Sequence, residues 1–208
     1  MAIGNESLRT AKTQLRAKAK EALGGINQAD RHRLSTMIHR RLLSLPAWAQ
    51  SDEVLLFDSM PDEVNTGPLI TAADREGKRI YLPRMHGGDI YFHLFAAADL
   101  EPHSYGMMEP PADAPMWSPA AADATGRQTV IICPGLAFDD HGRRLGRGKG
   151  FYDRFLSGLA GAPQRNPTVA IIAICLELQL VDEVPTGSHD QRVDVVVTEG
   201  RTVRAGPR

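Results

Sequence analysis

The chain has 208 residues, of which 42% are hydrophobic and 24% are charged, as in an ordinary globular protein. Its formal net charge of −1 at pH 7 and its aromatic content of 6% argue against a basic nucleic-acid-binding module, so no nucleic-acid partner is expected. A chain of this length can bury enough surface to fold without disulfides or structural metals, and we expect a single α/β domain over residues 1–208.

Cysteine usage and hydropathy favour a cytoplasmic protein. Cys133 and Cys175 each end an apolar run and are predicted to be buried, unpaired thiols, which fits a reducing compartment. The N-terminus lacks the apolar segment of a signal peptide, and the longest apolar run, Val169–Leu176, is far shorter than the ~18 residues of a membrane span. We therefore expect a soluble, cytoplasmic monomer with no membrane partner.

A basic helical segment is predicted over about residues 7–45. Apolar residues recur at helical spacing from Ser7 to Leu23, and Gly24-Gly25 is a natural stop. Asn27 can cap a second helix, which is expected to end at Pro46. The core face of this second helix is predicted to consist of Leu34, Met37, Ile38, Leu42 and Leu45.

The first predicted helix carries a basic stripe, because Lys12, Arg16 and Lys20 lie at positions i, i+4 and i+8. The surrounding residues 7–41 contain nine Lys or Arg and only two acidic residues. This pattern has two interpretations. The stripe is either a solvated helix surface or a surface that partly contacts an anion.

Further along the chain, short apolar runs alternate with helical patterns. The runs predicted as strands are Val54–Phe57, Ile80–Pro83, Ile90–Phe95, Val130–Cys133, Val169–Leu176 and Val193–Thr198. Helices are predicted at Leu69–Glu76, ended by Gly77, and at Phe151–Leu159. Gly87-Gly88 is predicted as a turn, and the Pro-rich segment Leu100–Gln128 as mostly irregular.

This alternation indicates an α/β fold with a mainly parallel central sheet flanked by helices. Ligands of such sheets bind at the carboxyl ends of the strands, near the point where the strand order reverses. The sequence therefore predicts a ligand site at the carboxyl ends of the strands.

The most informative segment is Pro134–Arg154, which contains a glycine-rich phosphate loop over residues 142–153. Glycines alternate with cations in the order Gly146, Arg147, Gly148, Lys149, Gly150. Glycine permits positive φ and a close approach to the backbone, N–H groups at a helix N-terminus bind anions, and the cations add full charges. The predicted ligand is a phosphate chain, and the alternative is a flexible basic surface loop. The spacing matches neither a Walker A loop nor the dinucleotide fingerprint.

The same segment closely resembles the signature of the 5-formyltetrahydrofolate cyclo-ligase family, also called methenyltetrahydrofolate synthetases. That signature has Pro-Gly, then Phe-Asp, then Gly-x-Arg-Leu-Gly-x-Gly-x-Gly, then an aromatic pair followed by Asp, and Pro134–Asp153 follows this order. Shorter pieces similar to the family are Lys12-x-x-Leu15-Arg16, Asp58–Thr66, Leu82-Pro83-Arg84, Glu109-Pro110, Gln179, Pro185 and His189-Asp190. The resemblance covers about residues 9–199.

The resemblance implies a fold akin to the ribose-5-phosphate isomerase and CoA-transferase group. It also implies an enzyme that uses ATP and Mg2+ to close 5-formyltetrahydrofolate to 5,10-methenyltetrahydrofolate, with release of ADP and phosphate. In the family reaction the formamide oxygen is phosphorylated to an imidate phosphate, N10 of the folate attacks the activated carbon, and phosphate departs. Positioning and charge neutralisation are then sufficient, without a covalent enzyme nucleophile.

The resemblance and the chemistry of the side chains together place candidate residues in four groups. ATP is expected to contact Lys12, Arg16, Arg144, Leu145, Gly146, Arg147, Gly148, Lys149, Gly150 and Tyr152. Arg147, Lys149 and Tyr152 are expected to be catalytic. The folate is expected to contact Asp58, Glu63, Tyr105 and Phe151, and Mg2+ to bind Asp153 and Asp190.

The chemistry of these side chains fits their assignments to different degrees. A carboxylate at Glu63 suits the N–H edge of a reduced pterin, and carboxylates are the hard oxygen ligands that Mg2+ prefers. Tyr105 would stack on the folate, although ordinary packing explains it equally well. Phe151 stands where the family often has Tyr, so stacking is possible there but a hydroxyl role is excluded.

Three other functions fit parts of the sequence. A non-catalytic folate- or nucleotide-binding relative of the same fold would usually have lost a cation or a carboxylate, and here all are present. A sugar-phosphate isomerase or an acyl-CoA transferase explains neither the glycine-rich loop nor Lys12-x-x-Leu15-Arg16. A nucleic-acid module fits the basic N-terminal region but conflicts with the net charge.

Overall fold

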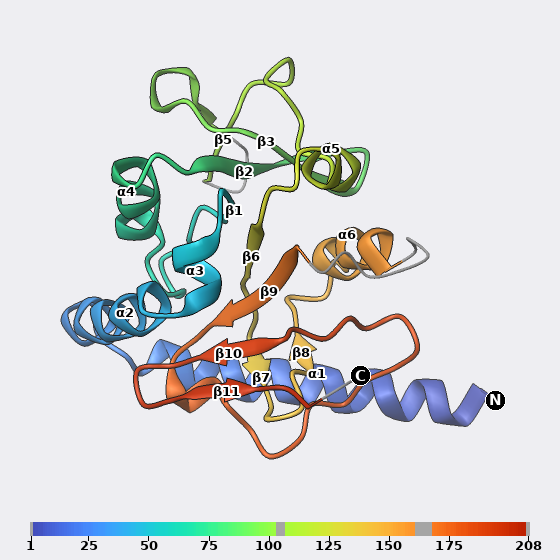
Figure 1. The fold of residues 1–208 in the computed structure, drawn as a ribbon. Helices are drawn as coiled ribbons and strands as arrows, with labels where there is room; N and C mark the ends of the chain where they lie inside the picture. The colour runs from blue at the N-terminus through green and yellow to red at the C-terminus, as the bar shows by residue number, and fades with distance from the viewer. Residues whose placement is uncertain (1, 103–106, 161–167, 207–208) are drawn as a thin grey trace.

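A computed structural model describes residues 2–102, 107–160 and 168–206 (Figure 1). Tyr105 lies outside these residues. The helices are α1 (Ala2–Gly24), α2 (Gln28–Leu43), α3 (Pro46–Gln50), α4 (Gly67–Arg75), α5 (Pro119–Ala124) and α6 (Phe151–Ala160), with 3-10 turns at Ala97–Asp99 and Glu177–Gln179. The strands are β1 (Glu53–Leu55), β2 (Arg79–His86), β3 (Asp89–Leu94), β4 (Glu101–Pro102), β5 (Met108–Glu109), β6 (Thr129–Cys133), β7 (Ala137–Phe138), β8 (Arg144–Leu145), β9 (Val169–Ile174), β10 (Val195–Val197) and β11 (Thr202–Arg204).

Within the described ranges, seven strands form one sheet in the order β11-β10-β9-β6-β1-β2-β3. The four inner pairs, from β10 to β2, are parallel, and the two edge pairs, β10–β11 and β2–β3, are antiparallel. The prediction of a mainly parallel sheet is therefore confirmed. The chain runs from β1 to β2 on one side and later enters β6 on the other side of β1, so β1 and β6 flank the point where the strand order reverses.

Both faces of the sheet are covered, which explains why β6 is apolar at successive positions. Val130 and Ile132 belong to the core under α1, α2 and α4, whereas Ile131 and Cys133 belong to the core under α5 and α6. Figure 1 shows α2 and α4 on one side of the strands and α5 and α6 on the other. A parallel strand buried on both faces needs apolar residues pointing each way.

Several predicted boundaries are confirmed by specific contacts. The side chain of Asn27 accepts a hydrogen bond from the backbone N of Asp30 at 2.9 Å, so it caps α2 as expected. Gly77, just after α4, has φ 70°, and Gly87 and Gly88 have φ 60° and 89° in the β2–β3 turn. Each glycine adopts a conformation that other residues avoid.

Other predictions were wrong in detail. Pro46 does not follow the last residue of α2 directly but opens the short helix α3, where proline suits the first turn and Trp48 is buried. Met37 is 40% exposed, so it is not part of the α2 core face. The Pro-rich segment contains the short helix α5, and the antiparallel edge strand β11 was not predicted.

The cysteine prediction is confirmed, because Cys133 and Cys175 are both buried and free. Burial raises the pKa of the Cys133 thiol to about 12, and the positive charge of Arg144 offsets this only in part, so the thiol stays protonated at neutral pH. Among the described helices, none is long and apolar enough to cross a membrane.

Candidate active site

A cavity of about 860 Å3 lies at the carboxyl ends of the two central strands. Phe57 and Asp58, just beyond β1, and Pro134 and Gly135, just beyond β6, all line it. The cavity therefore lies at the position where the sequence predicts a ligand site.

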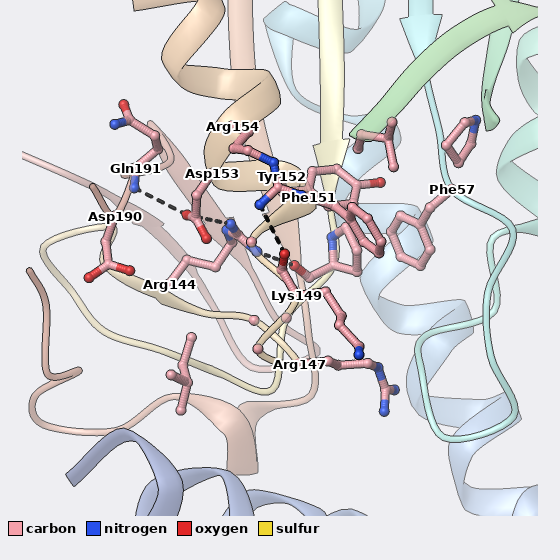
Figure 2. Close-up of a pocket in the computed structure, with 18 of the residues that line it drawn as sticks. Phe57, Arg144, Arg147, Lys149, Phe151, Tyr152, Asp153, Arg154, Asp190 and Gln191 are labelled. Atoms are coloured by element: carbon pink, nitrogen blue, oxygen red, sulfur yellow. Dashed lines mark hydrogen bonds and ion pairs between the residues drawn. The ribbon is translucent and has the colours of Figure 1, made fainter. Parts of the chain in front are cut away.

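The glycine-rich segment forms one wall of the cavity and is held by its own short-range contacts. Strands β7 and β8 make a small hairpin whose turn is fixed by the buried carboxylate of Asp139, which accepts hydrogen bonds from the backbone N of His141 and of Arg143 at 3.0 Å each. The loop then runs through Gly146–Gly150 into α6, as Figure 2 shows. The loop is therefore set on a braced hairpin at the start of a helix.

The three loop glycines have different conformations. Gly148 has φ 103° and Gly150 has φ 70°, so these two positions require glycine. Gly146 does not have positive φ. At Gly146 the restriction is one of space, because a Cβ atom would lie 3.1 Å from Nη1 of Arg144. The expectation of positive φ thus holds for two of the three positions.

Two arginines of this segment point to opposite sides of the loop (Figure 2). The side chain of Arg144 is 3% exposed, and its Nη2 lies 2.7 Å from Oδ1 of Asp153. Nη2 of Arg147 lies 2.7 Å from Oδ1 of Asp62 and 3.1 Å from Oε1 of Glu63. Although burial opposes it, these carboxylates raise the pKa of Arg147. Both cations are therefore already neutralised by protein carboxylates.

The basic stripe of α1 divides into a part that lines the cavity and a part that does not. Lys12 Nζ lies 2.6 Å from Oδ1 of Asp190, and Nε of Arg16 donates to the carbonyl oxygen of Gly146 at 3.0 Å. Both residues line the cavity, whereas Lys20 is exposed elsewhere. Of the two interpretations, contact with an anion is open to Lys12 and Arg16 only.

The two carboxylates predicted to bind Mg2+ are brought to the same wall of the cavity. Asp153 accepts hydrogen bonds from Arg144 and from the backbone N of Gln191, the neighbour of Asp190. Among the described residues there is no group of three His, Cys, Asp or Glu that could hold a metal ion. The pair therefore fits a cation that also takes phosphate oxygens and water, and not a metal centre made by protein ligands alone.

The opposite wall is mainly apolar and contains one deeply placed carboxylate. Phe57, Met60, Pro83, Met85, Ile90, Met107 and Phe151 line this side. The side chain of Glu63 is 12% exposed and accepts a hydrogen bond from the backbone N of Met60 at 3.0 Å. Burial raises the pKa of Glu63, and the nearby Arg147 offsets this only in part. The wall suits a flat heterocycle with N–H groups at one edge.

Tyr152 lines the cavity, and its hydroxyl is buried. The Oη atom of Tyr152 has no hydrogen-bond partner among the described residues, and burial raises its pKa well above the ordinary value. The guanidinium of Arg144 lies 5.5 Å from the Tyr152 ring centre. A buried hydroxyl without a partner is costly, so a ligand that supplies one would gain from this contact.

Asp58 lines the cavity but has a protein partner. Its Oδ2 accepts a hydrogen bond from the backbone N of Met108 at 2.9 Å. Glu109, which is buried, accepts one from the backbone N of Met85 at 3.1 Å. Together these two carboxylates hold the Met107–Glu109 segment beside the apolar wall. These contacts indicate that both carboxylates position the apolar wall.

All the predicted site residues within the described ranges line this one cavity. Sequence reasoning missed Asp62, which binds Arg147, and Arg154, which donates to the carbonyl oxygen of Lys149 at 3.0 Å. It also gave no role to Glu109. All three lie in segments that resemble the family. The partners of Asp62 and Glu109 are 85 and 24 positions away, so only the fold reveals those contacts, whereas Arg154 contacts Lys149 five positions before it.

Comparisons with known proteins agree with this geometry. The model of the 5-formyltetrahydrofolate cyclo-ligase family matches residues 9–199. A probable 5-formyltetrahydrofolate cyclo-ligase of Schizosaccharomyces pombe is 31% identical, over 93% of this chain and 97% of the relative, and a 5-formyltetrahydrofolate cyclo-ligase of Mycolicibacterium smegmatis is 33% identical over 95% of each chain. The solved 5,10-methenyltetrahydrofolate synthetase of Aquifex aeolicus superposes with a TM-score of 0.78 at 30% identity, covering 95% of this chain and 94% of that one.

Proposed function

The chain belongs to the 5-formyltetrahydrofolate cyclo-ligase family, and we propose that its cavity holds ATP along the glycine-rich loop and the folate against the apolar wall. The activity follows from the family: the chain is an ATP-dependent ligase of one-carbon metabolism that forms 5,10-methenyltetrahydrofolate from 5-formyltetrahydrofolate. The observation that carries the proposal is that five cations of the loop and of α1 meet the largely buried carboxylate of Glu63 in one cavity.

The phosphate end of the proposed site is the loop and the stripe of α1. Arg144, Arg147 and Lys149 approach from the loop, and Lys12 and Arg16 approach from the helix. Phosphoryl transfer depends on alignment and on neutralising charge at the oxygens, and arginines near the transferred group are effective at this. Leu145, Gly146, Gly148 and Gly150 would supply backbone at close range.

The folate end is the apolar wall together with Glu63. Its carboxylate would accept hydrogen bonds from the N–H edge of the pterin, and Phe151 would pack on the ring face. Asp58 would hold the Met107–Glu109 segment in place beside the ring. This arrangement would direct the N5-formyl group toward the loop cations.

The proposed reaction begins with attack of the formamide oxygen on the γ-phosphorus of ATP, which breaks the bond to ADP and gives an imidate phosphate. The N10 electron pair then forms a bond to the formyl carbon, the N10 proton passes to the phosphate group, and the C–O bond breaks as phosphate leaves with the former formyl oxygen. Arg147 and Lys149 would stabilise the transferred oxygens, and the unpartnered Tyr152 hydroxyl would donate to an oxygen of the formyl or phosphoryl group. No side chain needs to form a covalent bond.

Mg2+ is part of this proposal. Asp153 and Asp190 would hold it together with phosphate oxygens, and it would neutralise charge on the phosphate chain. Asp190 now pairs with Lys12 and Asp153 with Arg144, so these cations would turn to phosphate as the carboxylates turn to the metal.

We also propose that the chain acts as one α/β domain, as a monomer, in the cytoplasm. Support for the compartment comes from two free, buried cysteines, which suit a reducing environment. Light scattering of the purified protein during gel filtration tests the monomeric state, and a dimer mass would contradict it.

Absorbance at the methenyl-folate band tests the reaction. Purified protein is mixed with 5-formyltetrahydrofolate, Mg2+ and ATP, and each component is omitted in turn. The band is expected to rise only when all three are present. No rise with the full mixture, despite ATP binding in a calorimeter, would contradict catalysis and favour a non-catalytic binding protein.

A further inference from the structure

We propose that Asp62 is a positioning residue and that the ion pairs of Arg147 with Asp62 and Glu63 couple the binding of the two substrates. This inference rests on the proposed function, in which Arg147 serves the phosphate chain and Glu63 serves the pterin. The coupling changes the free energy with which each substrate binds, a property that the family activity does not specify.

One guanidinium joins the two halves of the cavity. Nε and Nη2 of Arg147 lie 3.2 Å and 3.1 Å from Oε1 of Glu63, and Nη2 lies 2.7 Å from Oδ1 of Asp62. Arg147 belongs to the loop proposed for ATP, whereas the two acidic residues belong to the segment proposed for the folate. The contact therefore runs from one subsite to the other.

Each ligand alone must disturb this contact. A phosphate chain that draws Arg147 away leaves the Glu63 carboxylate, 12% exposed, without its cation. A pterin that engages Glu63 leaves Arg147, 31% exposed, with Asp62 only. Separating a poorly solvated ion pair costs free energy, because each charge is then incompletely compensated.

Once one ligand has separated the pair, the second ligand does not bear that cost again. The charge of Glu63 is then free for pterin N–H groups, and that of Arg147 is free for phosphate. Coupling of this kind is reciprocal, so ATP strengthens folate binding by the same factor by which folate strengthens ATP binding. We expect a factor on the order of tenfold.

Asp62 has a separate role within this arrangement. Its side chain is 38% exposed, it makes the shortest contact with Arg147, and it precedes Glu63 in the chain. It keeps the guanidinium on the folate side in the ligand-free protein. Removing its charge favours transfer of Arg147 to a phosphate, while leaving the Glu63 carboxylate in place.

The coupling is measured by calorimetry with a non-hydrolysable ATP analogue, Mg2+ and 5-formyltetrahydrofolate. In the wild type, the Kd of the folate is expected to fall about tenfold when the analogue is saturating, and the Kd of the analogue to fall by the same factor with folate. In Arg147→Gln, which keeps hydrogen-bonding groups but loses the charge, the factor is expected to fall to about one.

The test of Asp62 uses a matched control. Asp62→Asn is expected to tighten binding of the analogue alone about threefold, by removing one of the two carboxylates that hold Arg147. The control is Glu183→Gln. Glu183 is an exposed carboxylate outside the cavity, and its Oε1 lies 2.9 Å from Nη1 of Arg143 on the β7–β8 hairpin. This variant is expected to change neither the Kd of the analogue nor that of the folate.

The outcomes separate this inference from the proposed function. Independent or mutually weakened binding of the two ligands in the wild type would overturn the coupling, although both ligands bind. Equal coupling in Arg147→Gln, or weaker analogue binding in Asp62→Asn, would overturn the role of this ion pair. Failure of either ligand to bind the wild type would instead contradict the proposed function itself.

Discussion

Two largely buried glutamates pair with arginine, one at the start of β1 and one in the loop that follows it, and their surroundings differ in an instructive way. Glu53, at the start of β1, is 2% exposed and lies within 3.5 Å of donors from Arg79, Arg127 and Trp117. Glu63, in the loop after β1, has Arg147 and one backbone N–H.

The partners of Glu53 approach from several directions and close it off from solvent. The arginine of Glu63 comes from a glycine-rich loop that lines an open cavity, and burial raises the pKa of Glu63. A raised carboxyl pKa shows that the ionised form is incompletely compensated. A pairing of glutamate with arginine thus stabilises the sheet at Glu53, whereas at Glu63 it leaves a carboxylate that can exchange its arginine for a ligand.

The largest effect is expected for an arginine of the cavity, because it should contribute to catalysis whereas an arginine that pairs with Glu53 should not. Arg144→Ala removes a buried cation from the phosphate end and should lower kcat/KM for ATP about 100- to 1000-fold. Steady-state kinetics measures this, with thermal unfolding to check the fold and Arg144→Lys as a partial rescue. Arg127→Ala is the control and should leave kcat/KM for ATP unchanged. An equal loss of kcat/KM in both variants would contradict the distinction between the cavity arginine and the arginine that pairs with Glu53.

Glu53→Gln tests the structural end of the comparison. It keeps an acceptor for Trp117 Nε1 but removes the charge that two arginines share, and we expect a loss of about 1–2 kcal/mol in stability. Because those arginines are partly exposed, water compensates for some of the loss. The Tm should fall by about 2–8 °C with unchanged KM for both substrates. Unchanged Tm would show that the network does not stabilise the sheet.

The smallest effect is a pH dependence at Glu63. Its folded-state pKa is raised above 4.5, so the folded state binds a proton more readily than the unfolded state, and stability falls as pH rises from 4.5 through the raised pKa. Glu63→Gln should therefore raise Tm slightly above that window, and the difference should vanish below pH 4.5. A lower Tm at neutral pH, as expected for Glu53→Gln, would contradict incomplete compensation at Glu63.

Much of the fold could be predicted because it depends on local patterns. The apolar runs of β6 and β9 and the cap at Asn27 are visible in the sequence itself. Met37 was misassigned because helical spacing alone does not say how wide the buried face is. The edge strand β11 was missed because three residues paired on one side carry little pattern.

The site was predictable as a set of residues but not as a set of contacts. The glycine-rich segment identified the phosphate end, and the family resemblance identified Lys12, Glu63 and Asp190. That Arg147 binds carboxylates, and that Lys12 neutralises Asp190, depends on chain segments 84 or more positions apart. Only the folded chain brings these partners together.

The central claim is that the cavity has a phosphate end and a folate end, and calorimetric titration of two variants tests it most directly. A non-hydrolysable ATP analogue with Mg2+ and 5-formyltetrahydrofolate are titrated separately into the wild type, Lys149→Ala and Glu63→Ala. Lys149→Ala should weaken the analogue about tenfold and leave the folate within about twofold, and Glu63→Ala should weaken the folate about tenfold without weakening the analogue. Weakening of the same ligand by both variants, or the reverse assignment, would contradict the division of the cavity.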